Sequence, residues 1–123
     1  MKSQIEFSMK NGRPVVNGIK VELPDLVTDT LIVDEGILVA VNDKGVGKDR
    51  NVYLISPDGR VLWQIEDPYP HLKDHYRGYT SLFFSVDGRI LAGCWVGVDF
   101  EVDVKTGKIK PWVDPKVPNK RPW

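Results

Sequence analysis

The segment from Asp67 to Tyr79 holds the densest group of reactive side chains, including both histidines of the chain, His71 and His75. Because histidine titrates near neutral pH, two histidines beside Lys73 could carry out general acid–base chemistry on a phosphodiester. No second motif supports such a nuclease site. We therefore predict that the protein is not an enzyme. The alternative is a small hydrolase or nuclease that uses His71 and His75.

The same histidines suggest a metal site, with Asp74 beside His75. A spacing of four residues places two side chains on one face of a helix. Pro70 and Gly78 leave little room for a helix, and the sequence contains neither an HExxH motif nor a pair of cysteines. We therefore predict no metal and no cofactor.

Binding of a protein partner is a third interpretation of this segment. Asp74, His75, Tyr76 and Arg77 are consecutive, and aromatic side chains with arginine supply most binding hot spots. Loops on a rigid β-scaffold often carry function. A structural interpretation stays open beside it, in which a polar loop caps one end of a sheet and its tyrosines lie at the edge of the core.

A second candidate surface follows Trp95. The acidic residues Asp99, Glu101 and Asp103 occupy alternate positions, so they share one face of a strand, with Phe100 between them. One interpretation is a solvated strand face that discourages edge aggregation. The functional interpretation is a docking surface for a basic partner, where an acidic patch steers association.

The composition is that of an ordinary globular protein. The 123 residues include 17 Lys and Arg against 17 Asp and Glu, so the net charge of zero excludes a nucleic-acid or membrane partner selected by bulk charge. A single cysteine, Cys94, excludes an intramolecular disulfide. No apolar run approaches the ~20 residues of a membrane helix, and the N-terminus lacks a signal-peptide pattern. We expect one cytoplasmic domain over residues 1–123, monomeric when free, with an extended Pro-rich tail at 113–123.

Short strands must position these side chains. Runs rich in Val, Ile, Leu and aromatic residues alternate with turn signals, among them Asn11-Gly12 and Asn17-Gly18, which favour tight hairpins. Helical periodicity is almost absent, apart from one turn that residues 70–79 could form. We predict an all-β fold: an antiparallel meander of about eight to ten short strands that forms a sandwich or an open barrel, with little or no helix.

Alternation within the strands predicts which faces are buried. Val52 and Leu54 point to one side of their strand and Tyr53 and Ile55 to the other, so this strand should lie between two layers. The runs at 61–65 and 82–84 are also apolar on both sides and carry the same expectation. In the last long run, the residues at 100, 102 and 104 face the core and the acidic residues face solvent.

Two hairpins are internal copies. Residues 56–62 (SPDGRVL) match residues 85–91 (SVDGRIL) at an offset of 29 positions. The stretches NVYLISPDGRVLWQI, SLFFSVDGRILAGCW and FEVDVKTGKI resemble the hairpins of β-propeller blades. A closed propeller needs at least four blades of ~40–50 residues, so one chain of this length cannot form one.

The layout of residues 51–109 also resembles a class of small bacterial proteins. NVY, DG and LWQI are followed by YTS and DGR, and then by W-x-G-x-x-F-x-V-D-x-x-T-G-K-I. This layout resembles immunity proteins of contact-dependent inhibition and related polymorphic toxin systems. The resemblance implies a protein that binds a cognate protein toxin and covers its active site, with no direct contact to nucleic acid or membrane.

Many such toxins are nucleases, whose cationic sites hold phosphates. Carboxylates would stand in for those phosphates, and an aromatic ring would fill the base pocket. A self-associating β-structural module is a further alternative. The candidate partner-binding residues are Asp74, His75, Tyr76, Arg77, Trp95, Asp99, Phe100, Glu101 and Asp103.

Overall fold

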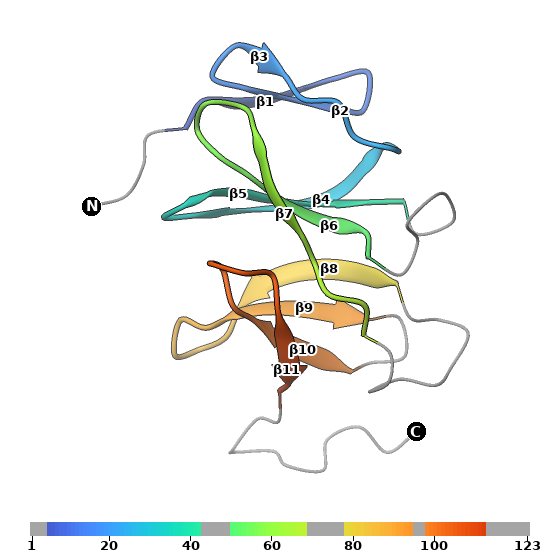
Figure 1. Cartoon of the computed structure of the whole chain (residues 1–123), viewed down its shortest axis with the longest axis vertical. Helices are drawn as coiled ribbons and strands as arrows, with labels where there is room; N and C mark the ends of the chain where they lie inside the picture. Colours follow the sequence, from blue (N-terminus) through green and yellow to red (C-terminus); the bar gives the residue numbers. More distant parts are fainter. Residues whose placement is uncertain (1–4, 43–49, 69–77, 95–97, 113–123) are drawn as a thin grey trace.

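The chain forms three antiparallel sheets, each a meander whose strands follow one another in sequence order. The computed structural model describes residues 5–42, 50–68, 78–94 and 98–112. Figure 1 shows the sheets as three successive layers. The N-terminal sheet contains β1 (Phe7–Lys10), β2 (Arg13–Val16) and β3 (Ile19–Lys20); the central sheet contains β4 (Val27–Val33), β5 (Gly36–Val41), β6 (Val52–Ile55) and β7 (Val61–Gln64); the C-terminal sheet contains β8 (Tyr79–Phe84), β9 (Ile90–Cys94), β10 (Asp99–Val102) and β11 (Ile109–Pro111).

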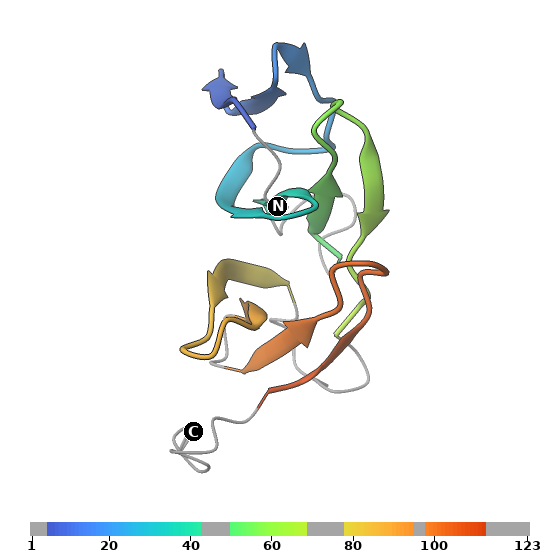
Figure 2. The ribbon, with the colours of Figure 1, turned by 90° about the vertical axis from the view of Figure 1, so that its left-hand side faces the viewer.

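The predicted all-β antiparallel fold is confirmed. The described residues form eleven strands, slightly more than the eight to ten expected, and they contain no helix. The three sheets stack as an open sandwich, and none of the described strands closes a sheet into a barrel. In Figure 2 the first strands of the central and C-terminal sheets, β4 and β8, lie on one side of the stack and the last strands on the other. No helix in the described ranges is long and apolar enough to cross a membrane.

Local turn chemistry explains the N-terminal sheet. Asn11 and Gly12 have φ angles of 55° and 75°, and Asn17 and Gly18 have φ angles of 49° and 81°. Two consecutive positive φ angles match the twist of the flanking strands, and Asn-Gly adopts them at low cost. Both predicted Asn-Gly hairpins are therefore confirmed, and they fold β1, β2 and β3 against one another.

The two middle strands of the central sheet are buried on both faces, and the alternation predicts this for β6. Val52 and Leu54 pack in the core that the central sheet shares with the C-terminal sheet. Tyr53 and Ile55 pack in a second core, shared with the N-terminal sheet. Because every residue of β5 and β6 is buried, these two strands form the middle of the molecule.

The expectation that residues 61–65 and 82–84 are covered on both sides is wrong at three positions. Val61 and Leu62 are exposed because they begin β7, the edge strand of the central sheet. Phe84 is 48% exposed and ends β8, an edge strand of the C-terminal sheet. An edge strand has no neighbour on one side, so its end remains open to solvent even when its residues are apolar.

Asn51 and Asp29 are two of the polar side chains that join the central sheet to the C-terminal sheet. Asn51 is 1% exposed, and its Nδ2 donates to the backbone oxygens of Val41 (2.8 Å) and Tyr79 (2.7 Å). Its Oδ1 accepts from the Tyr79 backbone N–H at 2.8 Å. Asp29 of β4 accepts from the Leu82 N–H of β8 at 2.8 Å. These bonds satisfy buried polar groups and set the position of β8 against the central sheet.

Candidate partner-binding face

The sequence-predicted residues divide into two groups. Asp74, His75, Tyr76, Arg77 and Trp95 lie outside the described residues. His71, the other member of the proposed catalytic pair, also lies outside them. The remaining four candidates, which are Asp99, Phe100, Glu101 and Asp103, belong to β10 and the turn after it.

β10 has one core face and one outer face. Phe100 and Val102 lie in the core shared with the central sheet. Phe100 is 0% exposed, and its ring meets that of Tyr79 edge to face, with 6.2 Å between centroids and an interplanar angle of 77°. Phe100 is therefore a core residue, and the prediction that it contacts a partner does not fit this structure. Asp99 and Glu101 alternate with it and lie on the outer face.

Glu101 is held in a network of opposite charges. Its Oε1 lies 2.9 Å from Nη1 of Arg89 and 3.6 Å from Nζ of Lys110. Lys110 is its direct neighbour on β11, an arrangement in which opposite charges stabilise a sheet. Only 21% of the Glu101 side chain is exposed. Two cations therefore offset its charge, and a partner would meet a mixed surface rather than an isolated carboxylate.

Asp99 lies close to the backbone of β9. A Cβ added at Gly93, directly opposite, would lie 3.0 Å from Oδ1 of Asp99 and 2.8 Å from Oγ of Ser81. The absence of a side chain at Gly93 leaves room for this carboxylate, which is 7% exposed. Asp99 is on the predicted face of the strand, but it is too deep to lead a surface contact.

Cys94 ends β9 beside this carboxylate. Burial, and secondly the negative charge of Asp99, raise the pKa of the Cys94 thiol to about 12. The thiol is therefore neutral at physiological pH, whereas nucleophilic and metal-binding cysteines react as thiolates. Its role here is that of a small buried side chain in the core.

Asp103 is exposed and holds the turn between β10 and β11. Its Oδ1 accepts from the Lys105 N–H at 2.9 Å, and its backbone oxygen accepts from the Gly107 N–H at 2.7 Å. The carboxylate thus shapes the turn while remaining open to solvent. Of the three acidic residues predicted to form the docking surface, Asp103 is the most accessible.

Sequence reasoning missed the pairing of Arg89 with Trp112. Nε of Arg89 lies 3.0 Å from Oδ2 of Asp87, and its guanidinium carbon lies 5.3 Å from the centroid of the Trp112 ring. With Glu101 included, the guanidinium contacts three side chains. Hydrogen bonds to Asp87 and then Glu101 raise the pKa of Arg89, a side chain that is charged at any physiological pH. The SVDGR turn was a visible signal for the Asp87 contact, but nothing placed Trp112 there.

A hollow of about 460 Å³ lies at the edge of this sheet. It combines carboxylates and ammonium groups around a short apolar floor. We call the exposed surface formed by Arg89, Glu101, Asp103, Lys108, Lys110 and Trp112 the β10–β11 face. The lining residues of the hollow are Glu101, Val102, Asp103, Val104, Lys108, Ile109 and Lys110.

The β10–β11 face has the chemistry of a binding surface. Within the described ranges, no three histidine, cysteine or acidic side chains lie close enough to hold a metal ion. What the face offers is an oriented arginine, an aromatic ring and charges of both signs. Such groups bind complementary protein surfaces by stacking and charge-assisted hydrogen bonds.

Comparison with known proteins places the chain in a family without assigning it an activity. No curated protein matches the chain. One family model matches residues 4–112, a span that includes every described strand. The chain therefore belongs to the family described as a domain of unknown function, DUF7957.

Proposed function

We propose that this protein is an immunity protein, which binds a cognate bacterial toxin in the cytoplasm and neutralises it by covering its active site. The observation that carries the proposal is the fixed guanidinium of Arg89 beside Trp112 on the β10–β11 face. Arginine and tryptophan are the residue types most enriched among binding hot spots. The resemblance of residues 51–109 to immunity proteins supplies the kind of partner.

Pre-organisation is the physical reason why Arg89 suits this task. A free arginine loses much side-chain freedom when it binds, and that loss weakens association. Here Asp87, Glu101 and Trp112 already restrict the guanidinium in the free protein. A partner that adds contacts to it therefore meets a smaller entropic cost.

The charge pattern narrows the kind of toxin surface that would fit. Glu101 is already paired with Arg89 and Lys110, so Asp103 is the carboxylate of the face that would meet a cationic group in an active site such as that of a nuclease. Lys108 and Lys110 line the same hollow, so the partner surface should carry acidic groups beside its cationic ones. A uniformly basic surface would be repelled by these lysines, which gives the pair specificity.

The proposal is tested by identifying the partner and its toxicity. Tagged protein is used to capture partners from the native lysate, and the captured partner is then expressed alone and together with this protein. We expect a stoichiometric partner that arrests growth alone and is harmless when this protein is co-expressed. Absence of a partner from a lysate shown to contain the toxin would contradict the proposal. A captured partner whose toxicity is not relieved would contradict it as well.

A matched pair of variants tests the face. Arg60 lies in the first of the two copied hairpins, at residues 56–62, and pairs with Asp58 at 2.9 Å. It is distant in sequence from the β10–β11 face. Arg60→Ala and Arg89→Ala remove the same side chain and the same charge. Protection against the toxin should survive the first substitution and fail, or need higher expression, with the second.

A further inference from the structure

The outer face of the N-terminal sheet carries an unexplained group of cations. Residues directly opposite one another share a face, and the register pairs Lys10 with Arg13 and Val15 with Lys20. Val16, next to Val15, packs in the core shared with the central sheet. Lys10, Arg13, Val15 and Lys20 therefore point away from that core, on the opposite side of the sheet.

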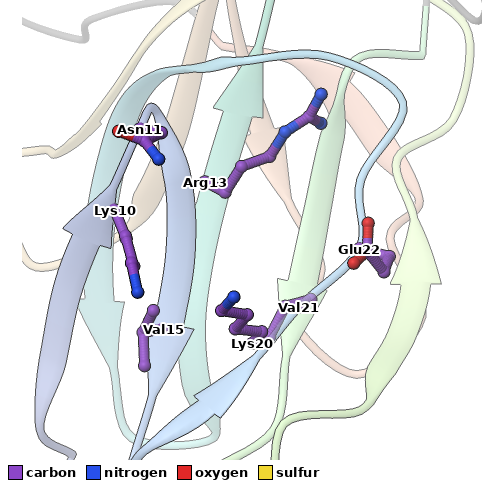
Figure 3. Close-up of a pocket in the computed structure, with 7 residues that line it drawn as sticks. All are labelled: Lys10, Asn11, Arg13, Val15, Lys20, Val21 and Glu22. Carbon is purple, nitrogen blue, oxygen red and sulfur yellow. The ribbon is translucent and has the colours of Figure 1, made fainter.

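These side chains surround a hollow of about 180 Å³. Figure 3 shows the side chains of Lys10 and Lys20 near Val15, with Glu22 at the far end of the group. Valine supplies an apolar floor, and Asn11 adds an uncharged amide. The lining residues are Lys10, Asn11, Arg13, Val15, Lys20, Val21 and Glu22.

The arrangement of charge is unfavourable without a ligand. Lys10 and Arg13 are directly opposite on neighbouring strands, and like charges in that position destabilise a sheet. Among the described residues, no ion pair involves Lys10 or Lys20. An anion placed between Lys10 and Lys20 would offset the positive charge of Lys10 and accept one charge-assisted hydrogen bond from each lysine.

Arg13 also lines this hollow, but its guanidinium bonds to the backbone. Its Nη1 donates to the backbone oxygen of Leu23 at 2.6 Å and lies 3.4 Å from that of Asp25. The guanidinium is therefore turned toward the chain that follows β3, as Figure 3 shows. Arg13 adds positive potential and fixes the rim of the hollow, while the two ammonium groups remain free to move onto a ligand.

We propose that this hollow binds a phosphate group, held by the ammonium groups of Lys10 and Lys20 above Val15. A phosphate monoester carries about 1.5 to 2 negative charges at pH 7, which two ammonium groups can offset. Glu22 confines the anion to the lysine end by repulsion. This site is independent of the proposed toxin binding, because it lies on the opposite end of the stack from the β10–β11 face.

The test is a titration of the full chain with inorganic phosphate at constant ionic strength, followed by backbone amide NMR shifts. We expect saturable shifts at residues 10, 11 and 20. The double variant Lys10→Gln/Lys20→Gln should bind at least about tenfold more weakly, since both charge-assisted hydrogen bonds are lost. Glu22→Gln should bind about two- to threefold more tightly, because a repulsive charge is removed.

The control is Lys108→Gln/Lys110→Gln, which removes the same number of charges from the other end of the molecule. It should bind phosphate like the wild type. Equal weakening in both double variants would mean that bulk charge attracts the anion, and would overturn the proposal. Shifts that never saturate would overturn it too. All four lysines are exposed, so these variants should remain folded, which circular dichroism checks.

A second ligand separates two sources of the phosphate group. Glycerol 3-phosphate carries the same group as a monoester, and it is titrated in the same way. Tighter binding of the ester would support a site for a phosphorylated metabolite, whereas tighter binding of inorganic phosphate would support a site for the free ion. Failure of both ligands to bind would contradict the site, whatever the outcome of the toxin experiments.

Discussion

The two copied hairpins share one turn but have different surroundings. In each, the first serine donates its hydroxyl to the aspartate two residues on, and that hydroxyl accepts from the arginine N–H, at 3.1 Å for Arg60 and 2.9 Å for Arg89. Each arginine Nε bonds to its aspartate, at 2.9 and 3.0 Å. Five residues of sequence therefore determine the turn wherever it occurs.

The surroundings decide what each turn does. The first turn supports the N-terminal sheet: Asn17 donates to the Pro57 oxygen at 2.7 Å, and Ile19 lies against Gly59. The second has nothing within 4 Å of a Cβ at Gly88, and its arginine reaches Glu101 and Trp112. A repeated sequence thus gives a structural support in one place and an oriented surface arginine in another.

Alanine at the two turn glycines should separate these roles most strongly. Gly59 and Gly88 have φ angles of 83° and 87°, so either substitution costs roughly 1–2 kcal/mol of backbone strain. Only at Gly59 would the new Cβ meet a neighbour, Ile19, at 2.8 Å. Overpacking should add about 1 kcal/mol or more.

Urea unfolding of the two glycine variants measures this difference. Gly59→Ala should lower the free energy of unfolding more than Gly88→Ala does. Adding Ile19→Ala to Gly59→Ala should remove part of the excess, because Cγ2 of Ile19, the nearest atom at 2.8 Å, is removed while its Cβ stays at 3.0 Å. Equal losses in the free energy of unfolding at the two glycines would contradict this, because they would show that the contact with Ile19 adds no cost at Gly59.

Removal of the arginines should have a smaller effect on stability. Arg89→Ala should lower the urea midpoint slightly more than Arg60→Ala, because Arg89 also pairs with Glu101 and lies over Trp112. Exposed ion pairs contribute little and are screened by salt. The difference should therefore shrink in about 1 M NaCl, the range in which screening is strong, and a difference that grows with salt would contradict this view.

The smallest expected effect is on the pKa values of the turn carboxylates, Asp58 and Asp87. The change should be similar in both copies of the turn. The serine hydroxyl is the main cause that lowers the pKa of Asp58 and that of Asp87. Ser56→Ala and Ser85→Ala should each raise the pKa of the neighbouring aspartate, as carboxyl NMR titration would show. A rise in only one copy would contradict the equivalence of the turns.

The direction of the associated pH dependence follows from the lowered pKa values. An aspartate in an unfolded chain has a pKa of about 3.9. Because the folded pKa values of Asp58 and Asp87 lie below this, ionisation favours the folded state. The contribution is present above the unfolded pKa and is lost as the pH falls through the folded pKa. The serine variants should lose less stability over that range.

Strands and turns were predictable because their determinants are local. Two Asn-Gly pairs, the copied SxDGR turns and the alternation of Val52 and Leu54 with Tyr53 and Ile55 each act within a few residues. These patterns identified the hairpins and the doubly buried strand. They did not predict that the meander divides into three sheets. That division depends on which consecutive strands do not pair with each other, namely β3 with β4 and β7 with β8.

The candidate site was less predictable because its contacts join distant residues. Glu101 and Asp103 were assigned to the outer face from alternation alone, and that assignment holds. The partners of Glu101 are Arg89, in the turn before β9, and Lys110 of β11, which lie 12 and 9 positions away in the sequence. The bond from Leu82 to Asp29 spans 53 positions, and no local pattern marks it. Phe100 showed the core alternation, so its place among the surface candidates conflicted with the pattern itself.

The central claim is that the β10–β11 face, through Arg89, binds the toxin, whereas the same turn in the first hairpin does not. The most direct measurement is the dissociation constant of the captured growth-arresting partner for the wild type, Arg60→Ala and Arg89→Ala. We predict that Arg60→Ala binds like the wild type, within about twofold, and that Arg89→Ala binds at least about tenfold more weakly. Equal affinities of the two variants would contradict the claim.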